Sequence, residues 1–548
     1  MYRHSLAALL GSMLAVHAIG CGEDVPPAGA EPDSTSSSSS SSSSGAPPVL
    51  DAGTPDAAPD VDVLPVTIDA PRDGSVVHAR NVHVRGRGLP GASLAWSLGT
   101  GASTPIELAA DGSFAFDVQP APGANEIRIA GTTEAGEPAS LTRKVHFGHR
   151  ISCGNSQSAM VYDGTLITWG RNERGQLGSG SFVPTWDEVD AINATLPTNY
   201  RPAAENVVSV VTRQTHMVAL HANGSVSVWG DNEFRQLGGG AAPASDCGSG
   251  VDATCANVPV LVPGISDAVA IDSGFDHLLA LRADGTVLAW GDNSKGQSGS
   301  ETGSLVEVPT TVAGLTDIVQ VGAGSDTSYA LDRSGHVFAW GDNAHANLGL
   351  GPKDTDAHPT PVQIPGLENV VSIVSSNGTP LALLADGTVK AWGRNHAGQV
   401  GIGTKSTVAE PVQTPQTVLT ADGAPLTNIE QIAGDGFVSV ALTRQGQVFV
   451  WGWGFIGQLA QGLLEVQPGE VEAEQDLTDR YFATPIKLPP GSSLDVREIE
   501  LGSGGPVFAW AHDDVIFGWG WSFRGSFGRK DFLDEWEYAS PVKVYPAN

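Results

Sequence analysis

His277 follows Asp276 directly, and an imidazole beside a carboxylate is a pairing that general acid–base catalysis uses. A second histidine, His216, stands at the same place in an earlier copy of the surrounding pattern. A histidine that repeats with its surroundings is typical of a buried structural group, and we expect His277 to be one. The sequence contains no His-Glu-x-x-His, Gly-x-Ser-x-Gly or phosphate-loop motif. It therefore predicts no catalytic residue, no cofactor and no enzyme activity.

Acidic residues crowd the segment from Glu465 to Asp479, where carboxylate oxygens could hold a divalent cation. Their spacing is irregular and specifies no coordination geometry, so we predict no metal. The formal net charge of the whole chain is −31. Such a chain is repelled by phosphate backbones, which argues against a nucleic-acid partner.

Four cysteines bear on redox chemistry. Cys247 and Cys255 bracket a glycine-rich loop, and we expect a disulfide that closes it. Cys153 lies in a predicted strand and is expected to be a buried thiol. Cys21 follows a short apolar stretch and has a different expected role.

The first 20 residues are typical of a signal peptide, because their apolar stretch is too short to span a bilayer. The Ala-Ile-Gly-Cys that ends at Cys21 resembles a bacterial lipobox, and the resemblance implies lipidation of Cys21. The alternative is an ordinary signal peptide with Cys21 incidental. We expect an exported lipoprotein of the outer membrane or cell surface that touches the membrane through its lipid alone. Release from the cell is the alternative. Residues 21–62 are rich in Ser, Pro and Ala and are typical of a disordered tether.

Residues 63–148 contain short runs with period-two alternation, such as "SFAFDV" and "NEIRIAG". Phe114, Phe116 and Val118 face one way in the first run, and Ile127 and Ile129 do so in the second. This pattern predicts a small antiparallel β-sandwich. The stretch is similar to the immunoglobulin-like modules of bacterial surface proteins.

Residues 149–548 repeat themselves. A Trp-Gly pair recurs every 50 to 68 residues, a period typical of a propeller or solenoid. Between the pairs lie four short strand patterns, among them one containing Pro-Val or a close variant, so we predict an all-β, seven-bladed propeller. We expect each repeated tryptophan to fill the space between blades, and the Asn that follows most of the pairs to cap a turn. The seven tryptophans are Trp169, Trp229, Trp290, Trp340, Trp392, Trp451 and Trp519.

The first repeat lacks a Pro-Val strand of its own, and a spare one occurs in the C-terminal segment 539–548. We expect this segment to complete the first blade and close the ring.

These repeats closely resemble the RCC1 (regulator of chromosome condensation) family. The motifs that carry the resemblance are Gly-x-x-His, Ala-Leu, Asp-Gly, Trp-Gly-x-Asn and Gly-Gln-Leu-Gly, over about 400 residues. In the first repeat we assign the histidine position to Ser156. The Asn is lost from the last two copies, which read "WGWG" and "WGWS". Drift of this kind is tolerated by packing residues, and it directs the search for function to the places where the pattern breaks.

The pattern breaks at the long loops and in the last repeat. Aromatic and arginine side chains beside acidic ones are typical of a protein-binding surface, although they could equally cover a divergent blade. The candidate ligand-binding residues are Trp186, Asp187, Tyr200, Trp521, Phe523, Arg524 and Trp536.

The sequence favours an exported, non-enzymatic binding or scaffold protein, a monomer that presents loops to a protein or a surface glycan. Exported propellers of this kind include β-lactamase inhibitors, which makes this role plausible by resemblance. The alternatives are guanine-nucleotide exchange on a small GTPase, which the resemblance implies, and a secreted polysaccharide-acting enzyme.

Overall fold

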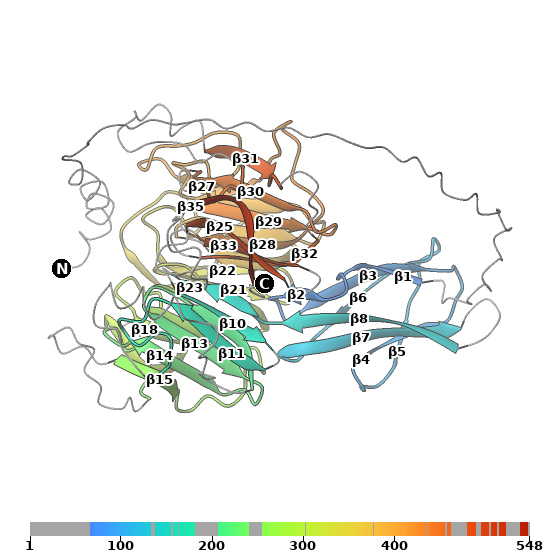
Figure 1. Cartoon of the computed structure of the whole chain (residues 1–548), viewed down its shortest axis with the longest axis horizontal. Coiled ribbons are helices and arrows are strands. Elements are labelled where there is room, and N and C mark those ends of the chain that lie inside the picture. Colours follow the sequence, from blue (N-terminus) through green and yellow to red (C-terminus); the bar gives the residue numbers. More distant parts are fainter. Residues whose placement is uncertain are drawn as a thin grey trace, which may run out of the picture. The chain divides into compact units, whose positions relative to one another are not determined.

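A computed structural model of the chain describes residues 66–132, 138–154, 157–162, 164–180, 206–240, 255–301, 303–375, 377–435, 437–454, 457–461, 479–488, 495–502, 506–511, 515–521 and 537–545. Within these ranges every regular element is a β-strand (Figure 1). No helix of the described residues is long and apolar enough to cross a membrane. Residues Val63–Val466 and Val471–Asn548 form one compact unit, to which all of the described residues belong.

The N-terminal module consists of two sheets that enclose one core. The first sheet has the order β1-β3-β6 and the second β2-β8-β7-β4-β5. Phe114 and Val118 of the first sheet and Ile127 and Ile129 of the second are all buried in this core, as the alternation predicts. The strands are β1 (Val66–Ala70), β2 (Ser75–Val77), β3 (Val82–Gly88), β4 (Leu94–Leu98), β5 (Thr104–Ile106), β6 (Ser113–Val118), β7 (Gly123–Thr132) and β8 (Pro138–Phe147).

The repeat region follows as a series of antiparallel sheets. The first described sheet has three strands: β9 (Ile151–Cys153), β10 (Gln157–Tyr162) and β11 (Thr165–Gly170). Six four-stranded sheets come after it in the described residues. Each of the six is built from consecutive strands in chain order, so each sheet is one contiguous piece of sequence.

The bounds of these strands follow the repeat. They are β12 (Val207–Thr212), β13 (His216–His221), β14 (Val226–Asp231), β15 (Cys255–Leu261); β16 (Ala268–Ser273), β17 (His277–Arg282), β18 (Val287–Asp292), β19 (Leu305–Thr311); β20 (Ile318–Ala323), β21 (Thr327–Asp332), β22 (Val337–Asp342), β23 (Ala357–Gln363); β24 (Val370–Ser375), β25 (Pro380–Leu384), β26 (Val389–Gly393), β27 (Val412–Thr417); β28 (Ile429–Asp435), β29 (Val438–Thr443), β30 (Val448–Gly452), β31 (Arg480–Pro485); and β32 (Val496–Leu501), β33 (Pro506–Ala511), β34 (Ile516–Trp521), β35 (Glu537–Tyr545).

The C-terminal strand corrects one prediction. β35 pairs with β34, with Gly518 opposite Val542 and Trp521 opposite Glu537. It therefore completes the last sheet, and the expectation that it would complete the first is wrong. The physical reason is that each Pro-Val strand pairs with the Trp-Gly strand before it in the chain, as β15 does with β14.

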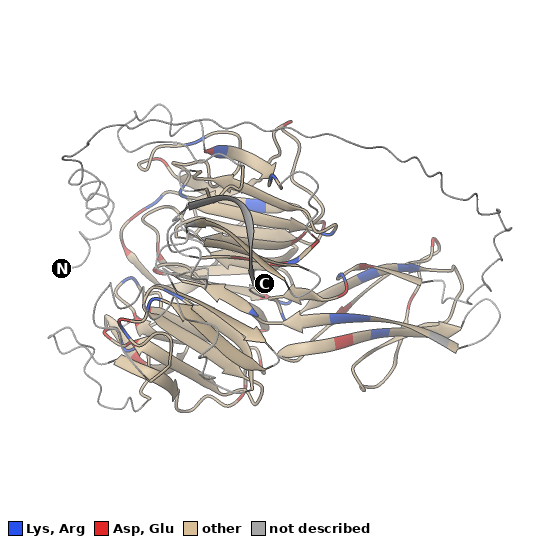
Figure 2. Ribbon diagram, in the orientation of Figure 1, with Lys and Arg blue, Asp and Glu red and all other residues tan. Residues whose placement is uncertain are grey.

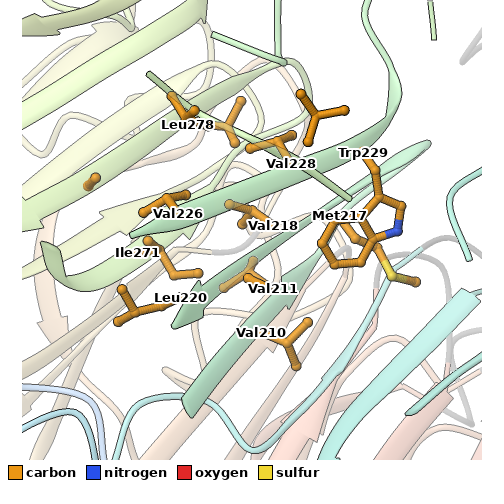
Figure 3. Packing of buried hydrophobic residues seen from close by; sticks show 14 of the residues in the cluster. Val210, Val211, Met217, Val218, Leu220, Val226, Val228, Trp229, Ile271 and Leu278 are labelled. Atoms are coloured by element: carbon orange, nitrogen blue, oxygen red, sulfur yellow. The ribbon is translucent and has the colours of Figure 1, made fainter. Parts of the chain in front are cut away.

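Apolar side chains fill the space between neighbouring sheets, as the close view of the second repeat sheet shows (Figure 3). Val218 and Leu220 of β13 lie with Val226 and Val228 of β14, while Ile271 reaches in from the next sheet. The inner strands of each sheet, such as β13 and β14, therefore bury both of their faces, which explains their nearly continuous apolar runs. Charged residues are correspondingly sparse on the repeat strands (Figure 2).

The first and last sheets also pack together. Ile151, Met160 and Trp169 share one buried cluster with Phe508 and Ile516 of the last sheet. Since each sheet also contacts the next one in the chain, this contact closes the series into a ring. We call this contact the seam. Closure rests on side chains here, because β35 belongs to the last sheet and not to the first.

The ring has two faces. In each four-stranded sheet the third strand ends with Gly or with the residue after Trp-Gly, and the loop from the first to the second strand lies at the same end. We call this end the Trp-Gly face. The turns between the second and third strands, such as Ala283–Thr286, lie at the opposite end, which we call the hairpin face.

Candidate functional site

The repeated tryptophans connect each sheet to the sheet before it by packing and by a hydrogen bond. Six of them are 0% exposed and Trp169 is 7% exposed. In each of the six, the indole Nε1 donates a hydrogen bond to the backbone carbonyl of the Gln or Asn in the preceding repeat's Gly-Gln-Leu-Gly element, at 2.8–3.0 Å. Trp290, for example, donates to the carbonyl of Gln236 at 2.8 Å. The ring and its N–H are both used inside the protein, so these residues serve packing.

The Asn of the motif orders the turn that carries this carbonyl. The Asn293 side-chain oxygen accepts from the backbone N–H of Ser298 at 3.1 Å, and its amide donates to the carbonyls of Ser300 and Gly303. Asn172, Asn232, Asn343 and Asn395 accept from the equivalent backbone N–H at 2.9–3.4 Å. The expected turn cap is therefore what the side chain forms.

The repeat histidines join neighbouring sheets. His216 Nε2 lies 2.8 Å from Ser273 Oγ, and His277 Nε2 lies 2.9 Å from Ser328 Oγ, in each case across to the next sheet. Burial lowers the pKa of both imidazoles to about 3, so both are neutral at neutral pH. His277 is consequently a structural residue and a poor general acid.

The pairing pattern corrects the position assigned to the first repeat. Gln157 pairs with Gly170 as His216 pairs with Gly230, so Gln157 takes the histidine position. The assignment of that position to Ser156 is wrong, and Ser156 itself lies outside the described residues. The Gln157 amide donates to the carbonyl of Gln214 at 3.0 Å, which replaces the histidine's link to the next sheet.

The residue directly after each Trp-Gly pair is one of the motif positions that vary between repeats. In chain order it is occupied by Arg171, Asp231, Asp292, Asp342, Arg394, Trp453 and Trp521. Because the Trp-Gly ends share one face, these residues form an arc on that face, which we call the variable arc. Its side chains are cations on two sheets, carboxylates on three successive sheets and an aromatic ring at Trp453, and the sequence places a second tryptophan at Trp521. The carboxylates of Asp231 and Asp292 are buried. A surface with different chemistry at each place can recognise a specific partner.

The acidic part of the variable arc is crowded. Asp276, from the loop between β16 and β17, joins it and accepts a hydrogen bond from the Gln236 amide at 3.1 Å. Burial, followed by repulsion from Asp326, Asp231 and Asp292, raises the pKa of Asp276 to about 8. A cation delivered to this place would favour the ionised form of Asp276. No group of His, Cys, Asp and Glu within the described ranges is arranged to hold a metal ion.

The neighbouring part of the face holds an aromatic–arginine cluster. It consists of His345, Arg394, His396, Phe437 and Trp453, all half-buried. The Arg394 guanidinium contacts His345 and lies 5.5 Å from the centre of the Phe437 ring. Phe437 meets Trp453 edge to face at 5.8 Å, and His396 at 5.0 Å. Arg and aromatic side chains that are ordered yet partly exposed are typical anchors of protein interfaces.

Both histidines of this cluster are neutral at neutral pH. Burial, and then the positive charge of Arg394, lowers the pKa of each to about 4. The cluster therefore carries one permanent cation framed by uncharged rings.

The sequence of residues 122–483 matches the RCC1-like domain, and the match spans well over half of the chain. The chain belongs to the RCC1-like family. Among curated proteins, it is 26% identical to the ultraviolet-B receptor UVR8 of Arabidopsis thaliana, over 72% of this chain and 69% of UVR8. It is 30% identical to the mitochondrial RCC1 domain-containing protein RUG3 of the same plant, over 66% of this chain, and spans 64% of RUG3.

The solved structure of Prp20p from Saccharomyces cerevisiae, studied with its binding properties to Gsp1p and histones, has the same fold. Its TM-score is 0.54 at 20% identity, over 69% of this chain and 85% of that one. Prp20, yeast RCC1, also matches with a TM-score of 0.54 in a complex with Kap60, over 69% of this chain and 83% of that one at 20% identity. The repeat sheets are therefore those of an RCC1-repeat β-propeller.

Most of the residues predicted as a site on this RCC1-like propeller lie outside the described residues: Trp186, Asp187, Tyr200, Phe523, Arg524 and Trp536. Trp521 is the last residue of β34 and occupies the variable arc. Cys21 and the segment 465–478 are outside as well. Asp479 is described, and its carboxylate accepts from the backbone N–H of Gly454 at 3.0 Å, directly beside Trp453.

The cysteines of the RCC1-like propeller divide as follows. Cys255 begins β15 and is disulfide-bonded. Cys247 lies outside the described residues, so its pairing with Cys255 stays a prediction. Cys153 is 0% exposed, and its thiol lies 3.9 Å from the carbonyl of Pro506 across the seam.

Sequence reasoning missed the aromatic–arginine cluster. Its signal was present at Arg394, which replaces the Asp of "WGDN", and at Trp453, which replaces it in "WGWG". Phe437 and His345 carried no such signal, because they belong to separate loops that only the ring brings together.

Proposed function

We propose that this chain is a non-enzymatic binding protein that presents the Trp-Gly face of a seven-bladed RCC1-like propeller to a protein partner. The observation that carries the proposal is that some positions of the motif are structural while another varies in its chemistry. Six of the tryptophans and five asparagines of the motif bond inside the protein, while the residue after Trp-Gly is Arg, Asp or Trp in different repeats. Two matched structures of this fold concern proteins that bind other proteins, Gsp1p and histones in one case and Kap60 in the other, which supports a protein rather than a small molecule.

The proposed partner surface has basic groups for the acidic part of the variable arc and an acceptor for Arg394. Asp276 retains its proton near neutral pH while no cation is near, and a Lys or Arg side chain from a partner would compensate the crowded carboxylates. Phe437 and Trp453 supply apolar contact area beside them. A surface glycan is the alternative ligand, since carbohydrates also stack on partly exposed rings.

The proposal extends to where the protein works. The first 20 residues and Cys21 support export and lipid anchoring, with the N-terminal module as an immunoglobulin-like sandwich and the protein acting as a monomer. Fractionation of the native cells tests this placement. We expect the chain in the membrane fraction and sensitive to protease added outside the cells. Recovery in the cytosol alone would overturn export.

Cross-linking on intact cells tests the binding face. The double variant Arg394→Ala/Trp453→Ala should reduce capture of the cross-linked partner at least tenfold, as measured by mass spectrometry against the unaltered chain. Arg128→Ala is the matched control, because Arg128 is exposed on β7 of the module. Capture that survives the double variant contradicts the aromatic–arginine cluster as an anchor. The same experiment with Trp186→Ala/Trp521→Ala tests the predicted loop residues.

Guanine-nucleotide exchange is the second candidate. It is favoured by the fold shared with Prp20p, whose structure was studied together with its binding to Gsp1p. Release of labelled GDP from a small GTPase measures it directly. Acceleration of release by catalytic amounts of this chain would support exchange, and an unchanged rate is the result that we expect.

A further inference from the structure

The short connection between the N-terminal module and the propeller is fully hydrogen-bonded. β8 ends at Phe147 and β9 begins at Ile151, so three residues join the two parts. The backbone N–H of Gly148 donates to the carbonyl of Val77, and that of His149 donates to Ser209 Oγ at 2.9 Å. The N–H of Arg150 donates to Glu498 at 3.2 Å. A connection with every N–H fixed in this way is not a flexible linker.

The module also bonds to several sheets of the ring at once. Arg72 Nε donates to Glu430 at 2.7 Å, and its other nitrogens reach the Asp495 carboxylate and the Val496 carbonyl at 3.1 and 2.5 Å. Those partners lie at the starts of β28 and β32. The exposed fraction of the Glu430 side chain is 11%, so this ion pair is largely shielded from water.

Arg80 makes the corresponding contacts on the other side of the ring. Its backbone N–H donates to the Val319 carbonyl of β20 at 2.8 Å, and its guanidinium donates to the Ala283 carbonyl at 2.7 Å. A third contact joins His146 Nε2 to the Val208 carbonyl of β12 at 3.0 Å. Every one of these acceptors lies at the hairpin face, so the module is held there at widely separated points.

Between these hydrogen bonds, apolar side chains of the module pack against apolar side chains of the ring. Ala79 is buried with Val319 and Leu331, and Phe147 is buried with Leu281 and other core residues of the ring. Glycines permit the close approach: a Cβ on Gly123 would lie 3.0 Å from Val208, and one on Gly148 would lie 2.9 Å from Ser209. The surfaces of the module and the ring therefore fit closely together at these glycines.

The segment between β2 and β3 reaches the centre of the ring. His78 stacks on His149 with their ring centres 4.2 Å apart. Both line a cavity of about 40 Å³ whose other walls are the innermost strands of several sheets, including Ser152, Val211 and Ile432. Burial holds the pKa of His78 well below its usual value, so this ring is uncharged where it sits.

We propose that the N-terminal module is a fixed plug that closes the central channel of the propeller at the hairpin face. The module then docks and undocks as one body, and partners reach the Trp-Gly face, at the opposite end of the strands. This inference stands whether or not the proposed partner binding is correct, because it concerns contacts within the chain.

Amide hydrogen exchange on the full-length protein tests the plug. The Arg80 amide reports the contact, since it donates across to the propeller, while the amides of β7 that pair with β8 report the module alone. We expect the Arg80 amide to exchange at least 100-fold more slowly than in an unstructured peptide. Exchange at the unstructured rate in the unaltered protein overturns the plug.

The variant Arg72→Ala tests whether the contacts act together. We expect the Arg80 amide to exchange at least tenfold faster in this variant, although Arg72 and Arg80 bind different sheets, while the β7 amides stay unchanged. Arg128→Ala should leave both reporters unchanged. Equal acceleration of the Arg80 and β7 amides, or no acceleration of the Arg80 amide, contradicts a plug that moves as one body.

Discussion

In the Trp-Gly motif, a structural tryptophan lies only two positions before a residue that is a candidate for recognition. The indole N–H of each of six repeated tryptophans is spent on a backbone carbonyl of the preceding repeat, so the ring cannot offer it to a partner. Two residues further on, the side chain of the variable arc carries Asp on one sheet and Arg or Trp on another. Within three residues, the motif therefore contains a tryptophan that is the same in every repeat and a side chain that differs between repeats.

Substitution of Trp290 separates burial from hydrogen bonding. Trp290→Ala should lower the free energy of unfolding by about 3–5 kcal/mol through the cavity that it leaves. Trp290→Phe keeps most of the ring but leaves the Gln236 carbonyl without its donor, which should cost about 1–3 kcal/mol. Urea denaturation measures both. Equal losses in the two variants would contradict a contribution from the bulk of the ring.

The buried histidines predict a pH dependence of stability. The pKa of His277 is about 3 in the folded protein, below its ordinary value of 6.5, so the unfolded chain binds a proton first as the pH falls. The free energy of unfolding should therefore fall below pH 6.5, by about 3 kcal/mol per such histidine at pH 4.5. His277→Gln should lose less stability between pH 7 and 4.5 than the unaltered chain, in urea denaturation at both pH values. If the free energy of unfolding depends on pH identically in the two proteins, the lowered pKa of His277 is contradicted.

Asp276 acts in the opposite direction. Its folded pKa of about 8 lies above the ordinary value of 3.8, so its contribution to stability is present below pH 3.8 and is lost as the pH rises from there to about 8. This carboxyl could not be singled out from sequence as a strained group. The aspartates that raise its pKa stand in neighbouring repeats, and only the ring brings them together.

At the scale of elements, each repeat is a four-stranded sheet followed by an ordered turn. The strands and their period were predictable from the spacing of the Trp-Gly pairs and from alternation such as that of Phe114 and Val118. The partner of the Pro-Val strand was not, because a strand midway between two Trp-Gly strands has the same local pattern whichever of them it joins. Pairing of Asp231 with Cys255 decides for the preceding one.

The turn after Trp-Gly should be a separable source of stability. Asn293→Ala removes three hydrogen bonds from the turn and should cost about 1–3 kcal/mol of unfolding free energy. Asn223→Ala is the control, since Asn223 bonds only within an exposed hairpin turn, and it should cost less than about 1 kcal/mol. Urea denaturation compares them, and a larger loss in the control would contradict the role given to Asn293.

At the scale of the whole molecule, long-range ion pairs decide how the parts join. Arg72 and Glu430 are 358 residues apart, and Arg150 and Glu498 are 348 apart. Neither pair leaves a trace in local sequence, which explains why the strands of the module could be predicted while its docking could not. Physical closure of the ring likewise depends on residues from its two ends.

The seam gives a prediction at this scale. Glu498 is 0% exposed and its pKa is raised by burial, while Arg150 pairs with it at 3.1 Å and lies 4.1 Å from the centre of the Trp510 ring. Arg150→Ala leaves a buried carboxylate and should cost about 3–5 kcal/mol. The double variant Arg150→Ala/Glu498→Gln should recover part of that loss in denaturant titrations. If Glu498→Gln recovers no stability, the loss in Arg150→Ala does not come from an unpaired Glu498 carboxylate.

Closure by side chains rather than by a shared strand has a consequence for how such a chain can change over generations. In the six four-stranded sheets, each repeat is one contiguous segment that brings its own outer strand. Duplication or loss of such a segment leaves every remaining sheet whole, and requires that the side chains meeting at the seam still pack together. A gene of this kind can therefore revise what it recognises by exchanging one repeat at a time.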